Sequence, residues 1–382
     1  MERRYSKFAK EIMTTGNIEQ DKGQNVANGS QTWLEIQQQP ELWPTTVARV
    51  RESIARLQLP TRLTDARVVL TGAGTSAYAA TAVAAAWSRS TAVPSTDLLL
   101  ATEHYMEEAT VLVSLARSGN SPESMAVVER VHRLHPQVWH LAITCNPQGA
   151  LAKSPLVNSI ILDPRTNDQS LVMTSSFSNL LLAGLCLAKG DLMESVISDA
   201  ATEAQRSLAL INQKMRSLAN SVEDRVLLLA SSPLFGWAQE GALKVLEMTD
   251  GRFPVMAETY LGLRHGPMSF IRPSTRVICL LSSDPAARLY EKDLIRELRA
   301  KKLGYVVGIC QEDCGDIKAS QLFDELIPAL LPQASDAFRT PFEILGPQLF
   351  GYHLSLRAGL NPDSPSPGGV INRVVQGIRI YN

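Results

Sequence analysis

Two short turns rich in glycine, serine and threonine have the composition of an anion-binding site. The first turn, residues 71–76, reads Thr-Gly-Ala-Gly-Thr-Ser and follows the apolar residues 68–70. The second turn, residues 117–123, reads Arg-Ser-Gly-Asn-Ser-Pro-Glu and follows the apolar residues 111–115. Glycines let a ligand approach the backbone, and hydroxyl groups supply further hydrogen-bond donors. The two turns together are therefore suited to hold a phosphate monoester.

The elements that position these turns follow from the same pattern. Each apolar segment predicts a buried strand, and the residues after each turn predict a helix, over residues 77–87 and 124–134. A helix N-terminus leaves N–H groups unpaired and carries the positive end of the helix dipole, so it attracts an anion. On neighbouring strands of a parallel sheet, both turns would lie at the carboxyl edge, where ligands bind in α/β proteins.

The chain repeats its strand pattern at an offset of about 160 residues, which indicates a duplicated unit. Each unit alternates short apolar segments with helical ones, so we expect an α/β fold with two parallel sheets, each covered by helices on both faces. Residues 192–219 predict a helix that links the two units. The paired segments are 67–70 with 225–229, 111–115 with 277–281, 141–145 with 306–310, and 160–162 with 326–327.

The second unit carries acid and base groups in place of the glycine-rich turns. Its own turns, residues 231–236 and 282–285, are less suited to a dianion. Lys244 and Glu247 are three residues apart in a predicted helix and share one face, among apolar neighbours that would desolvate the carboxylate and strengthen it as a base. His265, in the sequence Arg-His-Gly-Pro, is flanked by turn-forming residues and a second cation. We expect the first unit to bind phosphate and the second to transfer protons.

These motifs also have plainer interpretations. Gly72, Gly74 and Ala77 fit a dinucleotide-binding fingerprint with Asp97 as the ribose ligand, although Asp97 does not follow a clear strand. A serine at a helix start can serve only as an N-cap, a Lys–Glu pair only as a surface ion pair, and a loop histidine can lack any chemical role. The histidines at 132, 135 and 140 do not share one ligand face, so we expect no metal site.

The composition excludes several classes of protein. The 382 residues carry a net charge of −1 with a pI near 6.6, so nothing indicates a nucleic-acid or membrane-surface partner. No apolar stretch is long enough to cross a bilayer, and the N-terminus has no secretory signal. We therefore expect a cytoplasmic protein whose five cysteines are reduced.

The N-terminal sequence predicts a weakly ordered segment followed by helices. Residues 1–30 are polar and predict a weakly ordered arm. Thr32 and Glu35 have the spacing of a capping box. Pro40 and Pro44 are expected to interrupt the chain before a helix over residues 45–57.

The two turns, the helix sequence Ala-Leu-Lys-x-x-Glu and the loop Arg-His-Gly-Pro together resemble the sugar isomerase (SIS) superfamily over residues 32–382. With residues 173–176 (Met-Thr-Ser-Ser) and 372–377 (Asn-Arg-Val-Val-Gln-Gly), they are similar to the galactosamine-6-phosphate deaminase and tagatose-6-phosphate ketose/aldose isomerase branch. The resemblance implies two flavodoxin-like SIS domains. Residues 31–210 would bind the phosphosugar, and residues 211–382, with the C-terminal tail, would supply the acid and base groups.

The resemblance implies a set of substrate-binding hydroxyl groups. Ala116 stands where related synthases have another phosphate-binding serine, so this cradle has one hydroxyl fewer. Four of the implied residues would hold the sugar phosphate, and the last would lie near the sugar: Thr75, Ser76, Ser118, Ser121 and Thr174.

The resemblance also implies four catalytic residues. Glu247 would be the base that moves a proton between C1 and C2, and Lys244 would help to hold the open-chain substrate. His265 would open the sugar ring in the active site of a neighbouring subunit. Arg373 stands where the synthases have a tail lysine that can form an imine; because arginine stays protonated, we expect an electrostatic role instead.

The implied reaction is the deamination of a hexosamine 6-phosphate, best galactosamine 6-phosphate, to tagatose 6-phosphate and ammonia. The sequence carries no glutaminase domain, so we expect deamination rather than synthesis from glutamine. We expect no metal or organic cofactor, because a carboxylate base can transfer the proton unaided. We also expect a homodimer or higher homo-oligomer with shared active sites. Two alternatives stay open: an isomerase that does not deaminate, and a regulatory protein that binds a phosphosugar without chemistry.

Overall fold

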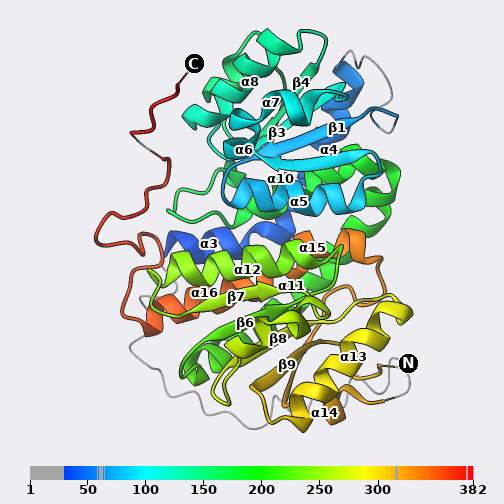
Figure 1. Cartoon of the computed structure of the whole chain (residues 1–382), viewed down its shortest axis with the longest axis vertical. Coiled ribbons are helices and arrows are strands. Elements are labelled where there is room, and N and C mark those ends of the chain that lie inside the picture. Colours follow the sequence, from blue (N-terminus) through cyan, green and yellow to red (C-terminus); the bar gives the residue numbers. More distant parts are fainter. Residues whose placement is uncertain are drawn as a thin grey trace.

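The computed structural model describes residues 30–57, 59, 63, 65–314, 317–375 and 377–381. Apart from Ser30, the predicted N-terminal arm (residues 1–30) lies outside them. The described chain forms two α/β halves stacked along the long axis of the molecule, with helices between them (Figure 1). Within these residues, no helix is both long and apolar enough to span a membrane.

The first half contains a five-stranded parallel sheet in the order β2-β1-β3-β4-β5. The two glycine- and serine-rich turns follow β1 and β3, which pair directly, so both turns meet at the carboxyl edge as predicted. β1 and β3 are buried throughout, as valine- and leucine-rich strands covered on both faces must be. The strands are β1 (Val68–Gly72), β2 (Ser90–Pro94), β3 (Val111–Ala116), β4 (Trp139–Thr144) and β5 (Asn158–Ile161).

The second half repeats this topology. Its parallel sheet has the order β10-β9-β8-β6-β7, which is the order of the first sheet read from the other edge. The four strand pairs predicted from the internal repeat occupy equivalent positions, so the predicted α/β fold with two parallel sheets is confirmed. The strands are β6 (Val226–Leu229), β7 (Val255–Glu258), β8 (Arg276–Leu280), β9 (Tyr305–Cys310) and β10 (Glu325–Pro328).

Helices cover both sheets. The two helices after the glycine-rich turns each begin two residues earlier than predicted, and the predicted linking helix is α11. The helices up to the link are α3 (Gln31–Gln37), α4 (Gln39–Arg56), α5 (Thr75–Ala86), α6 (Ser95–Leu100), α7 (Thr102–Met106), α8 (Pro122–Leu134), α9 (Ala150–Lys153), η1 (Pro164–Thr166), α10 (Ser175–Lys189) and α11 (Asp191–Ser221). The later ones are α12 (Phe235–Met248), η2 (Gly262–His265), η3 (Pro267–Phe270), α13 (Pro285–Ala300), α14 (Ala319–Leu322), α15 (Asp336–Glu343) and α16 (Leu345–Arg357).

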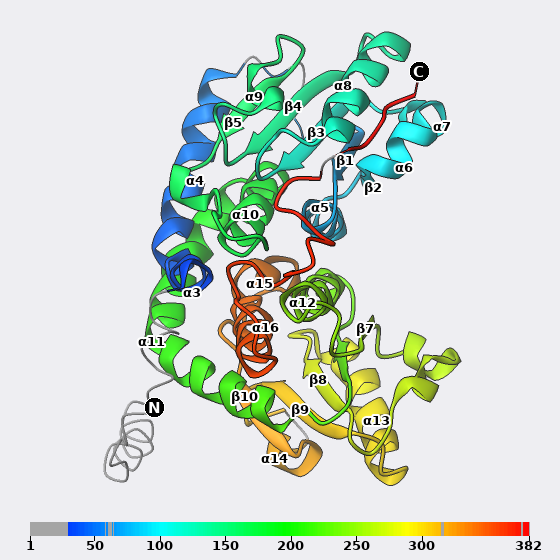
Figure 2. The same ribbon diagram turned by 90° about the vertical axis from the view of Figure 1, so that its left-hand side faces the viewer.

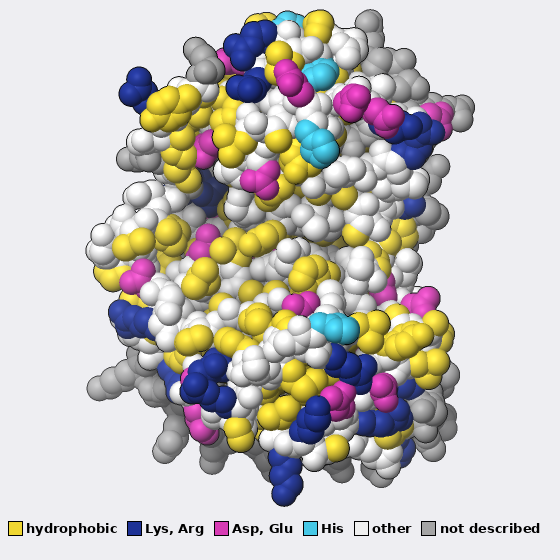
Figure 3. Space-filling view, viewed as in Figure 1, with side chains coloured by type: hydrophobic (Ala, Val, Ile, Leu, Met, Phe, Trp, Pro, Cys, Tyr) yellow, Lys and Arg dark blue, Asp and Glu magenta, His cyan; other side chains and the backbone are white. Residues whose placement is uncertain are grey.

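The two halves share one hydrophobic core. A single cluster of buried side chains runs from the first sheet through α5 and α10 to α12, α15 and α16. Alanines dominate α5, and a Cβ atom on Gly236 of α12 would come within 2.7 Å of the Ala82 side chain. Small residues therefore let α5 and α12 approach closely. The surface of the face seen in Figure 3 is hollowed between the halves.

The capping box predicted for Thr32 and Glu35 is wrong. Ser30, not Thr32, caps α3, by accepting a hydrogen bond from the Trp33 N–H at 3.1 Å. Thr32 instead hydrogen-bonds Asp363 of the C-terminal tail, and Glu35 accepts from the N–H groups of residues 169 and 170. The sequence could not show these long-range partners.

The prolines also do not interrupt the chain. α4 runs through Pro44, and Pro40 stands in its first turn, where a missing N–H costs little. Leu42 and Trp43 are fully buried beside these prolines, so tertiary packing outweighs the loss of one helical hydrogen bond. All five cysteines are free, in agreement with the prediction that they are reduced, and all five are buried.

Candidate active site

A cavity of about 180 Å³ lies at the carboxyl edge of the first sheet. Its walls come from the turns after β1 and β3, the loop before α10, α12 of the second half, and the C-terminal tail. Figure 2 shows the tail passing between α5 and α12 to reach this edge. Six of the nine residues predicted for the site line the cavity: Thr75, Ser76, Ser118, Ser121, Glu247 and Arg373.

The first turn opens its backbone and hydroxyl groups toward the cavity. Gly74 has a φ of 55°, in the left-handed region that favours glycine, and it precedes the first residue of α5. A Cβ atom on Gly72 would come within 2.7 Å of Ser76, so the turn also needs glycine at this position. Among the described residues, the Ser76 hydroxyl has no hydrogen-bond partner, which leaves it to a ligand at the helix N-terminus.

The second turn contributes one uncommitted hydroxyl and one that is already bound. Gly119 has a φ of 64°, which turns the chain after Ser118. The Ser118 Oγ accepts a hydrogen bond from the Asn120 N–H at 3.3 Å, so its own proton stays available for a phosphate oxygen. The Ser121 Oγ donates to Glu123 Oε2 at 2.6 Å, and Ser121 would have to leave this partner to bind an anion.

The helix α12 brings a buried cation and two carboxylates to the first turn. Lys244 Nζ lies 2.7 Å from Glu247 Oε2, 3.2 Å from Glu240 Oε1 and 3.1 Å from the Thr75 Oγ1. It also donates to the Met173 carbonyl oxygen at 3.1 Å. Lys244 is fully buried and lies behind the cavity wall, whereas the Glu247 side chain is 25% exposed and lines the cavity. The helix of one half is thus bonded to the first glycine-rich turn of the other.

Burial and shared charge set the ionisation of this cluster. Burial desolvates the Glu240 carboxylate and raises its pKa to about 8. The neighbouring Lys244 opposes this rise, and the charge of Glu247 adds to it. Burial alone would lower the pKa of Lys244, but the two carboxylates outweigh it and raise that pKa. The cluster therefore favours a charged Lys244, whereas burial works against the ionisation of Glu240.

The C-terminal tail is fastened to the site by two arginines. Arg373 donates from Nε to the Asp168 carbonyl oxygen at 2.9 Å and from its Nη2 to Asn167 Oδ1 at 2.9 Å. Arg117 of the second turn is buried and donates to the Arg373 carbonyl oxygen and, at 3.1 Å, to that of Leu171. Burial lowers the pKa of Arg117 from its usual value. The guanidinium of Arg373 thus serves to hold the tail against the cavity.

Thr174, predicted to lie near the sugar, does not line this cavity. It is fully buried, and its N–H and hydroxyl donate to the Asp168 carboxylate at 2.9 and 3.3 Å. Asp168 also accepts hydrogen bonds from the N–H groups of Ser175 and Ser176. A carboxylate of the chain itself therefore occupies the N-terminus of α10. The loop between Asp168 and α10 is therefore a rigid part of the wall.

His265 lies outside the cavity of its own chain. It ends η2 in the second half and is exposed to solvent. Its neighbour Arg264 forms ion pairs with Asp293 and Glu297 of α13. Asp97, the ribose ligand of the alternative dinucleotide interpretation, is exposed on α6 and does not line the cavity either.

Comparison with known proteins agrees with this geometry. The SIS domain family matches residues 64–189, which contain both turns. D-galactosamine-6-phosphate deaminase AgaS of Shewanella sp. (strain ANA-3) is 35% identical over 92% of this chain and 91% of its own length. The chain belongs to the SIS family. It is an enzyme of that family.

Two further relatives match over a similar share of the chain. D-galactosamine-6-phosphate deaminase AgaS of Escherichia coli is 33% identical over 93% of this chain and 96% of its own length. The crystal structure of tagatose-6-phosphate ketose/aldose isomerase from Escherichia coli superposes with a TM-score of 0.81 at 31% identity, over 91% of this chain and 97% of that one. The double-SIS architecture is thus shared with these relatives.

Sequence reasoning missed two buried carboxylates of this SIS enzyme. Glu240 lies one helical turn before Lys244 and two turns before Glu247, so the spacing alone could have placed all three on one face of α12. Asp168 precedes Thr174 by six residues and binds across a loop. No local sequence pattern predicts that contact.

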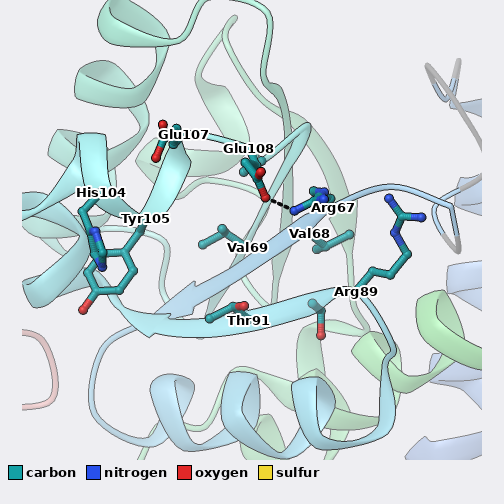
Figure 4. Close-up of a pocket in the computed structure, with 11 residues that line it drawn as sticks. Arg67, Val68, Val69, Arg89, Thr91, His104, Tyr105, Glu107 and Glu108 are labelled. Carbon is teal, nitrogen blue, oxygen red and sulfur yellow. Dashed lines mark hydrogen bonds and ion pairs between the residues drawn. The ribbon is translucent and has the colours of Figure 1, made fainter.

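A larger hollow, of about 590 Å³, lies at the other end of the first sheet. Figure 4 shows that its floor is made by Val68 and Val69 at the start of β1, with Thr91 of β2 beside them. The ion pair between Arg67 and Glu108 crosses one side. Because parallel α/β sheets bind ligands at the carboxyl edge, this amino-edge hollow is not the active site.

Proposed function

We propose that this enzyme deaminates a hexosamine 6-phosphate, best galactosamine 6-phosphate, to the ketose 6-phosphate and ammonia. The observation that carries the proposal is one cavity that joins the Ser76 and Ser118 hydroxyls of the first half to the Glu247 carboxylate of the second. A phosphate anchored at the turns would leave the far end of an open-chain sugar facing Glu247. The names of the AgaS relatives favour this substrate class.

The phosphate would be held by neutral donors and two helix N-termini. Ser76 and Ser118 have hydroxyl protons to give, and the N-termini of α5 and α8 add backbone donors and dipoles. Thr75 is bound to Lys244 and Glu240, so its side chain would serve mainly to fix the turn. Ser121 would exchange its bond to Glu123 for one to the phosphate.

Glu247 would act as the base for the isomerisation. It removes the proton from C2 of the open-chain amino aldehyde and returns a proton to C1, which converts the aldehyde to an alcohol and the amine to an imine. Water then adds to the imine carbon, and ammonia leaves, so the sum is hexosamine 6-phosphate plus water giving ketose 6-phosphate plus ammonia. Lys244 lies 2.7 Å from Glu247 but behind the cavity wall, so it would help to hold the open-chain substrate indirectly, by stabilising and orienting the Glu247 carboxylate.

The remaining predicted residues would act around this step. Arg373 would keep the tail over the substrate through its bonds to residues 167 and 168. His265 would open the sugar ring only in the site of a second subunit, because it is exposed and remote from its own cavity. This arrangement would require a homodimer or a higher homo-oligomer.

One alternative activity uses the same residues. A ketose/aldose isomerase that acts on a neutral sugar phosphate needs the same base and cradle, and the related tagatose-6-phosphate isomerase structure supports it. The buried Glu240–Lys244–Glu247 cluster argues against a purely regulatory sugar-binding protein, because binding a phosphate does not need it.

An ammonia-release assay on a panel of 6-phosphorylated sugars separates these activities. The proposal predicts ammonia from galactosamine 6-phosphate at a rate well above that from its glucose-type epimer, and none from unphosphorylated galactosamine. Interconversion of tagatose and galactose 6-phosphates without ammonia release from any amino sugar would favour the isomerase alternative instead.

A further inference from the structure

The second half repeats the two strand ends that form the phosphate cradle in the first. β6 and β8 pair as β1 and β3 do, and each is followed by a turn and a helix. The turns are residues 230–234 before α12 and residues 281–284 before α13. Both carry serines, so the duplicated fold places hydroxyl and N–H donors at a second carboxyl edge.

In this second cradle the donors are already bound to carboxylates of the chain. Ser231 Oγ and the Ser282 N–H donate to the two oxygens of Glu291 at 2.6 and 2.9 Å. The Ser283 N–H and Oγ donate to Asp336 Oδ1 at 2.8 and 3.0 Å, and the Ser282 hydroxyl donates to the other oxygen of Asp336. In the first cradle, by contrast, the Ser76 and Ser118 hydroxyls face the cavity.

A buried arginine completes the second cradle. Arg339 is 1% exposed and donates to Asp336 Oδ1 at 2.9 Å and to the Leu281 carbonyl oxygen at 2.8 Å. Its Nε is buried without a hydrogen-bond partner among the described residues. It lines, together with Ser282 and Arg288, a cavity of only about 20 Å³. That space holds about one water molecule and no phosphosugar.

We propose that the second half retains an oxyanion site whose ligand is the chain's own Asp336 carboxylate. The donors that hold this carboxylate are two serine hydroxyls, a backbone N–H and a guanidinium, which is the chemistry that binds phosphate. The chain accordingly binds one phosphosugar rather than two. Without the Asp336 carboxylate, the site takes a small tetrahedral oxyanion from solution.

The internal ligand also links the two halves. Asp336 begins α15, which packs against α5 and α10 of the first half and α12 of the second. On the same helix Phe342 stacks edge-on against Trp43 at 4.9 Å, and the Glu343 carbonyl oxygen accepts from Trp237 Nε1 at 3.0 Å. The contact of Asp336 with its cradle therefore holds α15 between the helices that carry the active site.

Anion rescue tests the proposal. Asp336→Ala empties the cradle and leaves Arg339 partly unpaired, so its thermal midpoint should fall by roughly 5–10 °C. Inorganic phosphate at about 100 mM should recover at least half of that loss, whereas chloride at equal ionic strength should not. Wild type in the same buffers corrects for phosphate bound at the first cradle.

Two variants control this measurement. Asp284→Ala removes the exposed N-cap of α13 next to the cradle, and phosphate should give it no more stability than it gives wild type. Asp336→Asn keeps the side chain in place without its charge. Its thermal midpoint should therefore fall, and phosphate should not restore it. The proposal would be overturned if phosphate raised the thermal midpoint of Asp336→Ala no more than that of wild type, or if it raised the midpoints of all variants equally.

Binding stoichiometry of the wild-type protein gives a test that needs no variant. Titration calorimetry with a hexitol 6-phosphate, which cannot react, should give one site per chain. Two sites per chain would overturn the proposal that Asp336 occupies the second cradle. No binding at all would instead contradict the proposed function, on which this second test rests. The anion rescue does not depend on that function.

Discussion

Lys244 is a buried cation shared by two carboxylates, and this sharing ties the chemistry of the site to its stability. Glu240 is fully buried with one oxygen that has no partner among the described residues. Burial raises the pKa of its carboxyl, while Glu247 takes the shorter ion pair to Lys244, at 2.7 Å. The two carboxylates on this face of α12 therefore differ in position: Glu240 is enclosed in the core, whereas Glu247 lines the cavity.

The raised pKa of Glu240 predicts a pH-dependent stability difference. The folded-state pKa of Glu240, about 8, lies above its ordinary value of 4.5. The contribution of this group to the free energy of unfolding is therefore fully present below pH 4.5 and is lost as the pH rises through about 8. Glu240→Gln removes this dependence but keeps the shape. The thermal midpoint of wild type should therefore fall relative to that of the variant between pH 5 and pH 9. A difference that does not change with pH would contradict the assignment.

The proposed role of Ser76 and Ser118 in phosphate binding predicts that their loss weakens substrate binding. Ser76→Ala and Ser118→Ala should each raise KM by about one to two orders of magnitude, since each removes a charge-assisted hydrogen bond of roughly 1.5–3 kcal/mol. Ser88→Ala, at an exposed site beyond the other end of α5, is the matched control and should leave KM unchanged. Steady-state kinetics measures all three variants, and unchanged KM values for both cradle serines would place the phosphate elsewhere.

At the scale of elements, the site depends on segments that have no regular structure. The tail residues 371–375 line the cavity, and their position rests on hydrogen bonds to Asp168, Asn167 and Arg117 rather than on a helix or strand. Glu35 of α3 holds the same loop from behind by accepting the N–H groups of residues 169 and 170. Segments from both ends of the described chain thus meet behind one loop of the first half.

Loss of the Arg373 side chain should release the tail. Arg373→Ala removes its bonds to residues 167 and 168, so KM should rise by about tenfold and amide hydrogen exchange should accelerate in residues 371–375. Arg379→Ala, farther along the exposed tail, should change neither. Normal exchange in these residues together with a normal KM would show that Arg373 does not fasten the tail.

The elements themselves differ in how well the sequence predicts them. Strands β1, β3, β4 and their partners in the second half are continuous apolar runs, and the repeat identified them. β2 and β7 are short edge strands with partly exposed residues, so no apolar run marked them. The hydroxyls of the cradle and Glu247 follow from local motifs, whereas Asp168 and the route of the tail depend on contacts across more than one element.

At the scale of the whole molecule, the two halves of the duplication have diverged in one particular way. The first half keeps an open cradle, and the second provides α12, whose Lys244 bonds to that cradle. The boundary predicted at residues 210 and 211 falls inside α11, which runs unbroken through it, and stays a prediction. The shared core means that neither half builds the active site alone.

Large apolar side chains are exposed on α12 and beside η2. Leu246 and Leu261 are 47% and 48% exposed, and apolar side chains gather along the middle of the face seen in Figure 3. His265 lies on the same half, four residues after Leu261, and is exposed without lining the cavity of its own chain. The predicted homodimer would place it in the active site of a second copy of the chain.

Subunit mixing tests this shared-site arrangement. Glu247→Gln and His265→Ala should each be inactive alone, but a mixed dimer has one doubly altered site and one intact site. Random reassortment should then restore about a quarter of wild-type activity. Subunit exchange proven by mass spectrometry without any recovery of activity would show that each chain builds its own site.

The central claim is that Glu247 moves a proton between C1 and C2 of a sugar phosphate held by the two serine turns. Exchange of the C2 hydrogen of galactosamine 6-phosphate with deuterium from D₂O, followed by NMR, tests it most directly. Wild type should catalyse the exchange, and Glu247→Gln should bind the substrate with similar affinity while its exchange rate falls by at least about a hundredfold. Exchange that continues at the wild-type rate in Glu247→Gln would contradict the account.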